Sequence, residues 1–190
     1  MNTPAIAELK AGILAKNPKL KNDSFKALLA LAKERPGVLY PEWDFFAGLV
    51  DPERGADTKY IGVYILAELT AVDSQAKFAH LFNAFYALLD DDSVIPPSHA
   101  ALVSGRIARH LPDLAGRITD KLLAIENTHH PASRRDLIKG YIIQAFEEYY
   151  DTLDSVRRKR VAEFVSAQQK SLSPKTAKLA RHFLKTHSAI

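Results

Sequence analysis

The hydrophobic positions along this chain form a short helical pattern that recurs five times. Each copy is a run of six residues with at least three apolar side chains, at a spacing that suits one side of an α-helix. The copies begin at residues 26, 64, 106, 141 and 179, which gives intervals of 38, 42, 35 and 38 residues. A repeat of about 40 residues with one apolar helix per unit is typical of stacked helix pairs.

Helix-start residues and apolar stripes together predict about five helix pairs and an all-α fold. Asp154 and Ser173 are expected to cap helices, and Ser133 with Asp136 resembles a capping box. Strand signals are weak, since the chain contains no Asn-Gly or Asp-Gly hairpin turn. No long linker divides the pairs, so we expect a single domain over residues 1–190. The expected pairs are 3–16 with 22–34, 41–50 with 56–70, 74–89 with 98–111, 113–127 with 132–150, and 154–171 with 174–187.

The segment 58–69 differs from the other predicted helices because it is apolar on almost every side. A helix of this kind must be covered by several neighbours, as a middle repeat would be. The repeat length favours HEAT or armadillo-like units over the tetratricopeptide repeat, which has 34 residues. The second helices also resemble HEAT second helices, with a basic residue ahead of an Ile/Leu-Ala-x-x-Leu core. Examples are Lys59 before Ile65–Leu69, and Arg106 before Ile107–Leu111.

Longer stretches resemble a family of uncharacterised bacterial and archaeal HEAT-like proteins. The resemblance spans about residues 39–187. It implies an α-α superhelix of the HEAT or armadillo type and brings no catalytic residues with it. The stretches that carry it are Leu39–Phe46, Leu66–Asp73, Lys77-Phe78, Arg117–Glu126, Val161–Val165 and Ala177–Lys185.

Composition narrows the function classes. The 190 residues include no cysteine, which excludes disulfides, thiolate metal sites and thiol nucleophiles. No apolar run reaches the roughly 18 residues of a membrane span, and the stretch 6–15 is broken by Glu8 and Lys10, unlike a signal peptide. We therefore expect a cytoplasmic protein without a membrane partner. No phosphate-binding loop or catalytic triad pattern is present, so we expect no enzyme activity, cofactor or small-molecule substrate.

Charge is distributed unevenly along the chain. Residues 1–95 carry 10 Lys and Arg against 13 Asp and Glu, whereas residues 96–190 carry 16 against 9. The densest basic run is Arg157-Arg158-Lys159-Arg160. A region of one sign attracts partners of the opposite sign. The simplest alternative is a solvated polar cap on a terminal repeat, which solenoids need for solubility.

The sequence therefore favours a helical-repeat scaffold that binds a protein partner with an acidic surface. Nucleic acid is the second hypothesis, although no exposed aromatic residues alternate with the basic run, as base stacking requires. We expect partner contacts along the second helices and the basic run. The ten candidate contact residues are Arg106, Arg109, Arg134, Arg135, Lys139, Arg157, Arg158, Lys175, Lys178 and Arg181.

Three further motifs could carry chemistry, and each also has a structural explanation. The triplet Asp90-Asp91-Asp92 could attract a cation, but no EF-hand spacing follows it, and a solvated helix end explains it better. His129-His130 lies in an expected turn without a second ligand pair, so we predict no metal site there. Trp43-Asp44 resembles the aromatic residue and aspartate of HEAT-like alkylpurine DNA glycosylases. The alternative is that Trp43 packs between the first two repeats.

Overall fold

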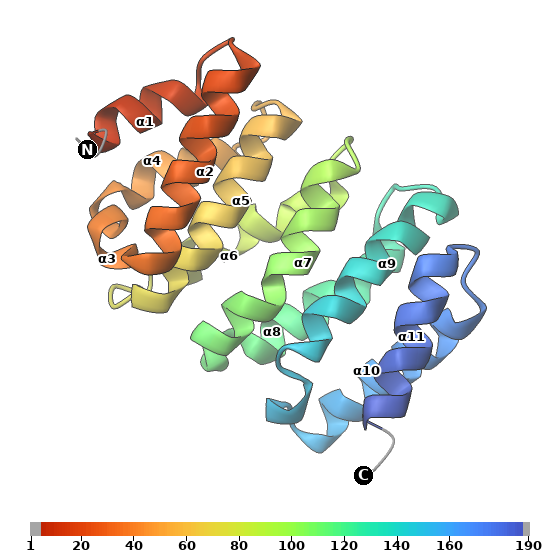
Figure 1. The fold of residues 1–190 in the computed structure, drawn as a ribbon. Coiled ribbons are helices and arrows are strands. Elements are labelled where there is room, and N and C mark those ends of the chain that lie inside the picture. Colours follow the sequence, from red (N-terminus) through yellow and green to blue (C-terminus); the bar gives the residue numbers. More distant parts are fainter. Residues whose placement is uncertain (1–4, 188–190) are drawn as a thin grey trace. The chain divides into compact units, whose positions relative to one another are not determined.

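The fold is all-α, as the periodicity predicts. The computed structural model describes residues 5–187, and within them the chain forms α-helices and short 3-10 turns without any strand. All five copies of the repeated pattern lie in helices, within or at the end of α2, α5, α7, α9 and α11 (Figure 1). Residues 3 and 4 of the first expected helix lie outside the described residues.

Two compact units follow one another along the chain, with the division between Phe85 and Tyr86 inside α6. The interpretation of residues 1–190 as one domain stays a prediction. The helices of unit 1 are α1 (Ile6–Ile13), α2 (Pro18–Glu34), α3 (Pro36–Leu39), α4 (Trp43–Ala47), α5 (Ala56–Leu69) and the first part of α6 (Lys77–Ala87), with 3-10 turns η1 (Tyr40–Glu42), η2 (Gly48–Val50) and η3 (Thr70–Val72).

Helix α5 is the centre of unit 1. It packs against α2, α3, α4 and η2, and most of its residues from Ile61 to Leu69 are buried. Its Gly62 lies so close to Leu49 and Val50 of η2 that a Cβ atom there would meet their side chains at 2.9 and 3.0 Å. The expectation that the segment 58–69 is covered on several sides is therefore confirmed.

Helix α2 begins earlier than the sequence analysis predicts. Pro18 rather than residue 22 is its first residue, because Asn17 caps the helix and its side chain accepts a hydrogen bond from the Leu20 N–H at 3.1 Å. Proline suits the first position of a helix, where a backbone N–H would have no partner within the helix. The Asn17-Pro18 pair, a capping side chain followed by a proline, is a stronger start signal than Asn22-Asp23.

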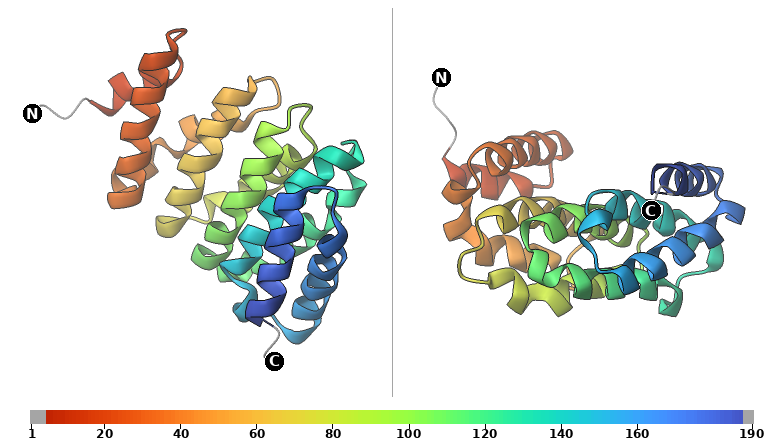
Figure 2. Two further views of the ribbon diagram at one scale, coloured as in Figure 1. Left: turned by 45° about the vertical axis from the view of Figure 1, so that its right-hand side comes forward. Right: turned by 90° about the horizontal axis from the view of Figure 1, so that it is seen from below.

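Unit 2 is built from two layers of helices. Helix α9 packs against both α7 and α11 in one layer, and α8 contacts α10 in the other (Figure 1). Figure 2 shows the same helices from two further directions. We call α7, α9 and α11 the second layer, because they are the second helices of the predicted pairs. The elements are η4 (Leu88–Asp90), α7 (Ile95–His110), α8 (Pro112–Leu123), η5 (Ala124–Asn127), α9 (Ala132–Glu147), η6 (Tyr150–Thr152), α10 (Ser155–Ala167), η7 (Gln168–Lys170) and α11 (Pro174–His187).

Close contact between α7 and α9 organises this layer. Gly105 of α7 faces the backbone of Ala145, and a Cβ at position 105 would lie 2.6 Å from the Ala145 carbonyl oxygen. Apolar side chains such as Ile107, Ile142 and Phe146 are fully buried in the core of the unit. The absence of a side chain at Gly105 therefore allows the two helix backbones to approach.

Candidate partner-binding surface

All ten candidate contact residues belong to unit 2, but they occupy different surroundings. Eight lie on the second layer and two, Arg157 and Arg158, lie on α10. Some are held by neighbouring acids, and others have no acidic neighbour. This difference decides which of them can meet a partner.

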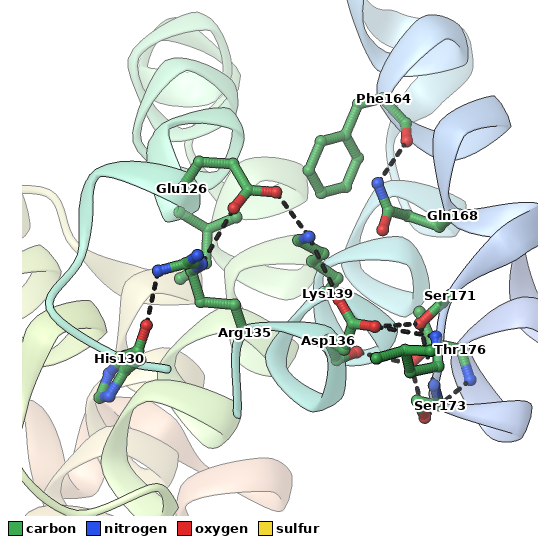
Figure 3. A network of polar contacts seen from close by, with 12 residues as sticks. Glu126, His130, Arg135, Asp136, Lys139, Phe164, Gln168, Ser171, Ser173 and Thr176 are labelled. Carbon is green, nitrogen blue, oxygen red and sulfur yellow. Dashed lines mark hydrogen bonds and ion pairs between the residues drawn. The ribbon is translucent and has the colours of Figure 1, made fainter. Parts of the chain in front are cut away.

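Lys139 and Arg135 form part of a polar network at the start of α9 (Figure 3). Only 7% of Lys139 is exposed, and its ammonium group lies 2.5 Å from Glu126 and 3.3 Å from Asp136. Arg135 lies 2.9 Å from the other oxygen of Glu126 and donates a hydrogen bond to the His130 carbonyl at 2.5 Å. Both cations are thus neutralised within the protein, and Lys139 is covered.

Asp136 links α9 to the loop before α11. Its carboxylate accepts hydrogen bonds from the Ser171 hydroxyl at 2.8 Å and from the Leu172 N–H at 3.0 Å, and its carbonyl accepts one from Thr176 at 2.7 Å (Figure 3). Burial alone would raise the pKa of Asp136, but these hydrogen bonds and Lys139 outweigh burial and hold the pKa below its usual range.

The capping box that the sequence predicts at the start of α9 is therefore wrong. Pro131 occupies the cap position, and no side chain caps the helix. Instead, the Asp136 carboxylate accepts hydrogen bonds from Ser171 and Leu172 in the loop before α11. The predicted cap at Ser173 is confirmed, since its hydroxyl accepts a hydrogen bond from the Thr176 N–H at 3.3 Å.

Arg157 is also held in place by its surroundings. Its guanidinium lies 2.6 Å from Asp154, the residue that caps α10, and 3.9 Å from Asp120 of α8. The same group covers Gly116 of α8, where a Cβ would lie 2.7 Å from Cζ of Arg157. Arg160 pairs with Asp120 at 2.6 Å as well. Two of the four cations in the basic run thus link α10 to acids at its own start and on α8.

The remaining candidates are more accessible. Lys175 is exposed and lies over the ring of Tyr141, 4.9 Å from its centroid, and Lys178 is exposed one turn further along α11. Within residues 5–187, neither of these two lysines has an acidic partner. Arg134 is exposed and donates to the Asp92 carbonyl at 3.0 Å.

Three other candidates are involved in contacts on the second layer. Arg109 lies 3.3 Å from Glu148, and Arg181 donates to the Gln169 carbonyl at 3.5 Å. Arg106 is half-buried and also interacts within the protein. Partner contact by these three would compete with the interactions that they already make.

An apolar groove lies between α7 and α9 next to Lys175. Its volume is about 180 Å³, and two of its residues, Ile95 and Leu137, are 44% and 49% exposed although both are large and apolar. The ring of Tyr141 lies 5.8 Å from that of His99 between centroids, and burial lowers the pKa of His99, which favours the neutral imidazole. The full lining is Val94, Ile95, Ser98, His99, Leu137 and Tyr141.

This groove was not predicted from the sequence. Tyr141 is the first residue of the fourth copy of the repeated apolar pattern, but the structure leaves it half-exposed. The signal that could have found the groove is the pair Leu137 and Tyr141. They are four residues apart and share one side of α9, whereas Ile138 and Ile142, the residues that follow each of them, are buried.

The aspartate triplet and the histidine pair come together in unit 2, which the sequence did not predict. The Asp90 carboxylate accepts hydrogen bonds from the backbone N–H of His129 and contacts its Nδ1, both at 2.7 Å. His130 is fully buried, with Nε2 3.1 Å from the Leu89 carbonyl. Burial would raise the pKa of Asp90, but the contacts with His129 hold it below its usual range. Among the described residues, no three His, Asp or Glu side chains are arranged to hold a metal ion.

Trp43 is packed in the core of unit 1. Only 2% of it is exposed, and its ring meets that of Tyr40 edge to face at 5.8 Å between centroids. Asp44 is exposed beside Lys77 and His80 in a shallow depression. Because the indole is covered by the protein, it cannot stack on an extruded base, and the glycosylase hypothesis loses the aromatic residue on which it depends.

Comparisons with known proteins identify no relative. No protein-family model, curated protein or solved structure matches this chain. Among the helices within residues 5–187, none combines the length and apolar character that crossing a membrane requires. The function must therefore be argued from the surface of the molecule itself.

Proposed function

We propose that this protein is a HEAT-like helical-repeat scaffold, with its helix pairs stacked into an α-α superhelix, that binds an acidic segment of a partner protein. The partner would lie on the second layer of unit 2, with one apolar side chain in the groove between α7 and α9. Repeat proteins commonly bind partners on an extended surface of this kind. The lack of cysteine is compatible with a reducing compartment, so we also propose a cytoplasmic location.

The observation that carries this proposal is the exposed apolar groove beside the exposed Lys175 and Lys178. Binding hot spots are apolar or aromatic residues surrounded by a polar rim. Ile95 and Leu137 supply the apolar centre, and Tyr141 supplies an aromatic surface. Lys175 and Lys178 lie on the α11 side of this centre without acidic partners within the described part of the chain.

Charge gives the bound segment a direction. The α7 end of the groove begins at Val94, two residues after Asp92 of the acidic triplet, and the Asp92 side chain is fully exposed. The α11 side carries Lys175 and Lys178. We therefore expect the acidic residues of the partner to lie over α11 and its uncharged residues to lie near Val94, because like charges at the α7 end would repel.

A nucleic-acid function has less support in the structure. Arg157 and Arg160 of the basic run pair with Asp120 and Asp154, which lowers the positive charge that a phosphate backbone would meet. No observation favours this alternative specifically. It would become the better explanation if DNA bound tightly near physiological salt with a steep salt dependence.

The test is a titration with a fluorescein-labelled peptide that has a central Leu-Phe pair flanked by glutamates. Leu137→Ser should weaken binding at least tenfold, because it removes the exposed side of the groove. Leu20→Ser is the matched control, since Leu20 is 50% exposed on α2 of unit 1 and lies outside the groove.

Equal loss of affinity in the two variants would contradict the groove as the binding site. The same would follow if a peptide with lysines in place of the glutamates bound as tightly as the acidic one. Circular dichroism of both variants should match the parent protein, because both replacements are at half-exposed positions and leave the core intact.

A further inference from the structure

A second pocket in unit 2 lies between the start of α10 and the end of α11. Its volume is about 330 Å³, nearly twice that of the α7–α9 groove. Three of its lining residues form a cluster of rings. Tyr150 lies 5.1 Å from Phe183 and 4.7 Å from His187, and the Phe183 and His187 rings are 4.5 Å apart between centroids. Ala162 and Leu184 add aliphatic surface.

The polar side chains of this lining can all donate hydrogen bonds, although the Tyr150 hydroxyl already donates to the Arg158 carbonyl at 3.4 Å, and none of them is a carboxylate. They are the hydroxyls of Tyr150 and Ser155, the guanidinium of Arg158 and the imidazole of His187. Arg158 is half-buried, and within residues 5–187 no acidic side chain pairs with it. A guanidinium in partly apolar surroundings without an acid is unusual, since charged groups that leave water are normally paired.

Two acids contact the lining residue His187. Nε2 of His187 lies 3.2 Å from Glu147, and Nδ1 lies 3.5 Å from Asp151. The imidazole therefore stands between these two carboxylates, neither of which lines the pocket. Arg157, the neighbour of Arg158 in sequence, is bound to Asp154 and faces α8 instead. Among the arginines of α10, Arg158 is thus the one that lines this pocket and can bind a ligand there.

We propose that this pocket binds a small carboxylate with an aromatic or aliphatic body. The ring cluster would hold the body, and Arg158 would bind the carboxylate through two parallel N–H bonds, with Ser155 as a further donor. The volume lies at the lower end of the range for small-molecule sites. A single guanidinium and one hydroxyl suit a planar carboxylate better than a phosphate, which carries more charge and more acceptor oxygens. The pocket is separate from the α7–α9 groove, so the proposal does not depend on the proposed function.

The test uses 3-phenylpropanoate as the probe, followed by ¹H–¹⁵N correlation spectra of the full chain. The carboxylate should bind at least tenfold more tightly than 3-phenylpropanamide, which has the same shape without the charge. The shifted signals should come from α10, α11 and η6. Acetate, which lacks the apolar body, should produce no saturable shift at the same concentrations.

The variant Arg158→Met keeps most of the aliphatic stem and should weaken binding of 3-phenylpropanoate at least tenfold. The matched control is Lys159→Met, which removes the next cation on the same helix, an exposed lysine outside the lining. Ala162→Phe should also abolish binding, because it fills the pocket while leaving Arg158 in place. Each variant is first checked for an unchanged helical spectrum.

Several results would overturn the proposal. No binding of 3-phenylpropanoate at any accessible concentration would do so, as would equal affinity for the amide. Equal weakening by Arg158→Met and Lys159→Met would show that the effect is general charge rather than this pocket. Tighter binding of phenyl phosphate than of the carboxylate would contradict the assigned ligand class.

Discussion

Helices α10 and α11 of unit 2 both carry several cations, but their surroundings differ. On α10, Arg157 and Arg160 pair with acids, and the Arg157 guanidinium covers Gly116 of the neighbouring α8. On α11, Lys175 and Lys178 have no acidic partner within the described residues, and Lys175 lies over an aromatic ring beside an apolar groove. Charge density alone therefore does not locate a binding surface. What matters is whether acids lie within reach of the cations, either at the start of the same helix or on the adjacent one.

The largest expected effect comes from disrupting the polar network at the start of α9. Asp136→Ala removes the acceptor for Ser171 and for the Leu172 N–H, and it removes one of the two acids around the covered Lys139. We expect the free energy of unfolding to fall by about 3 kcal/mol, because the buried Lys139 loses one of its two acids and the half-buried Ser171 loses its acceptor. Urea denaturation measures this change.

Glu163→Ala is the control for this loss. Glu163 is an exposed acid on α10, and its removal should change the free energy of unfolding by less than about 0.5 kcal/mol. If Asp136→Ala proved equally mild, the network would not be what stabilises the junction of α9 and α11.

The next effect concerns the approach of α7 and α9, which positions the groove. Gly105→Ala places a methyl group against the Ala145 backbone, which cannot move without separating the two helices. We expect a loss of about 2 kcal/mol in the free energy of unfolding. Gly116→Ala should cost less, because its neighbour is the flexible end of the Arg157 side chain. A larger loss for Gly116→Ala would contradict this reading of the two contacts.

A smaller effect is expected to distinguish Arg157 from its neighbour Arg158 by the change in Tm. Arg157→Ala removes the contacts with Asp154 and with Gly116 and should lower the Tm by about 2–4 °C. Arg158→Ala should leave the Tm almost unchanged, since Arg158 makes no ion pair within residues 5–187. Differential scanning calorimetry of the two variants measures the difference. Equal shifts would show that position on α10, rather than pairing, determines the contribution.

The smallest expected effect is a change in the pH dependence of stability. The pKa of Asp136 is lowered in the folded state, so this carboxylate stabilises the fold above its unfolded pKa of about 3.9. That contribution disappears as the pH falls through the folded pKa. Asp136→Asn should therefore flatten the decline of stability below about pH 4. If urea denaturation showed the same loss of stability at acid pH in the variant as in the parent, other carboxylates would determine that loss.

The sequence predicted the helical fold well but only part of the surface. The recurring apolar pattern located all five second helices, because core positions follow the helical period. Ion pairs between residues that are far apart in the sequence do not follow the helical period, so they could not be predicted from it. Asp120 lies 40 residues from Arg160, and Glu126 lies 13 residues from Lys139, so only the packing of helices brings these charges together. The groove was missed because Leu137 and Tyr141 look like ordinary members of an apolar stripe.

The most direct test of the account compares charge reversal on the two helices. Binding of the labelled acidic peptide is measured by fluorescence anisotropy for Lys175→Glu with Lys178→Glu on α11, and for Arg157→Glu with Arg160→Glu on α10. We expect the α11 pair to lose nearly all affinity while keeping its Tm. The α10 pair should lower the Tm and leave the affinity at a temperature below unfolding within a few-fold of the parent. Loss of affinity only in the α10 pair, or equally in both, would contradict the assignment of the binding surface to the second layer.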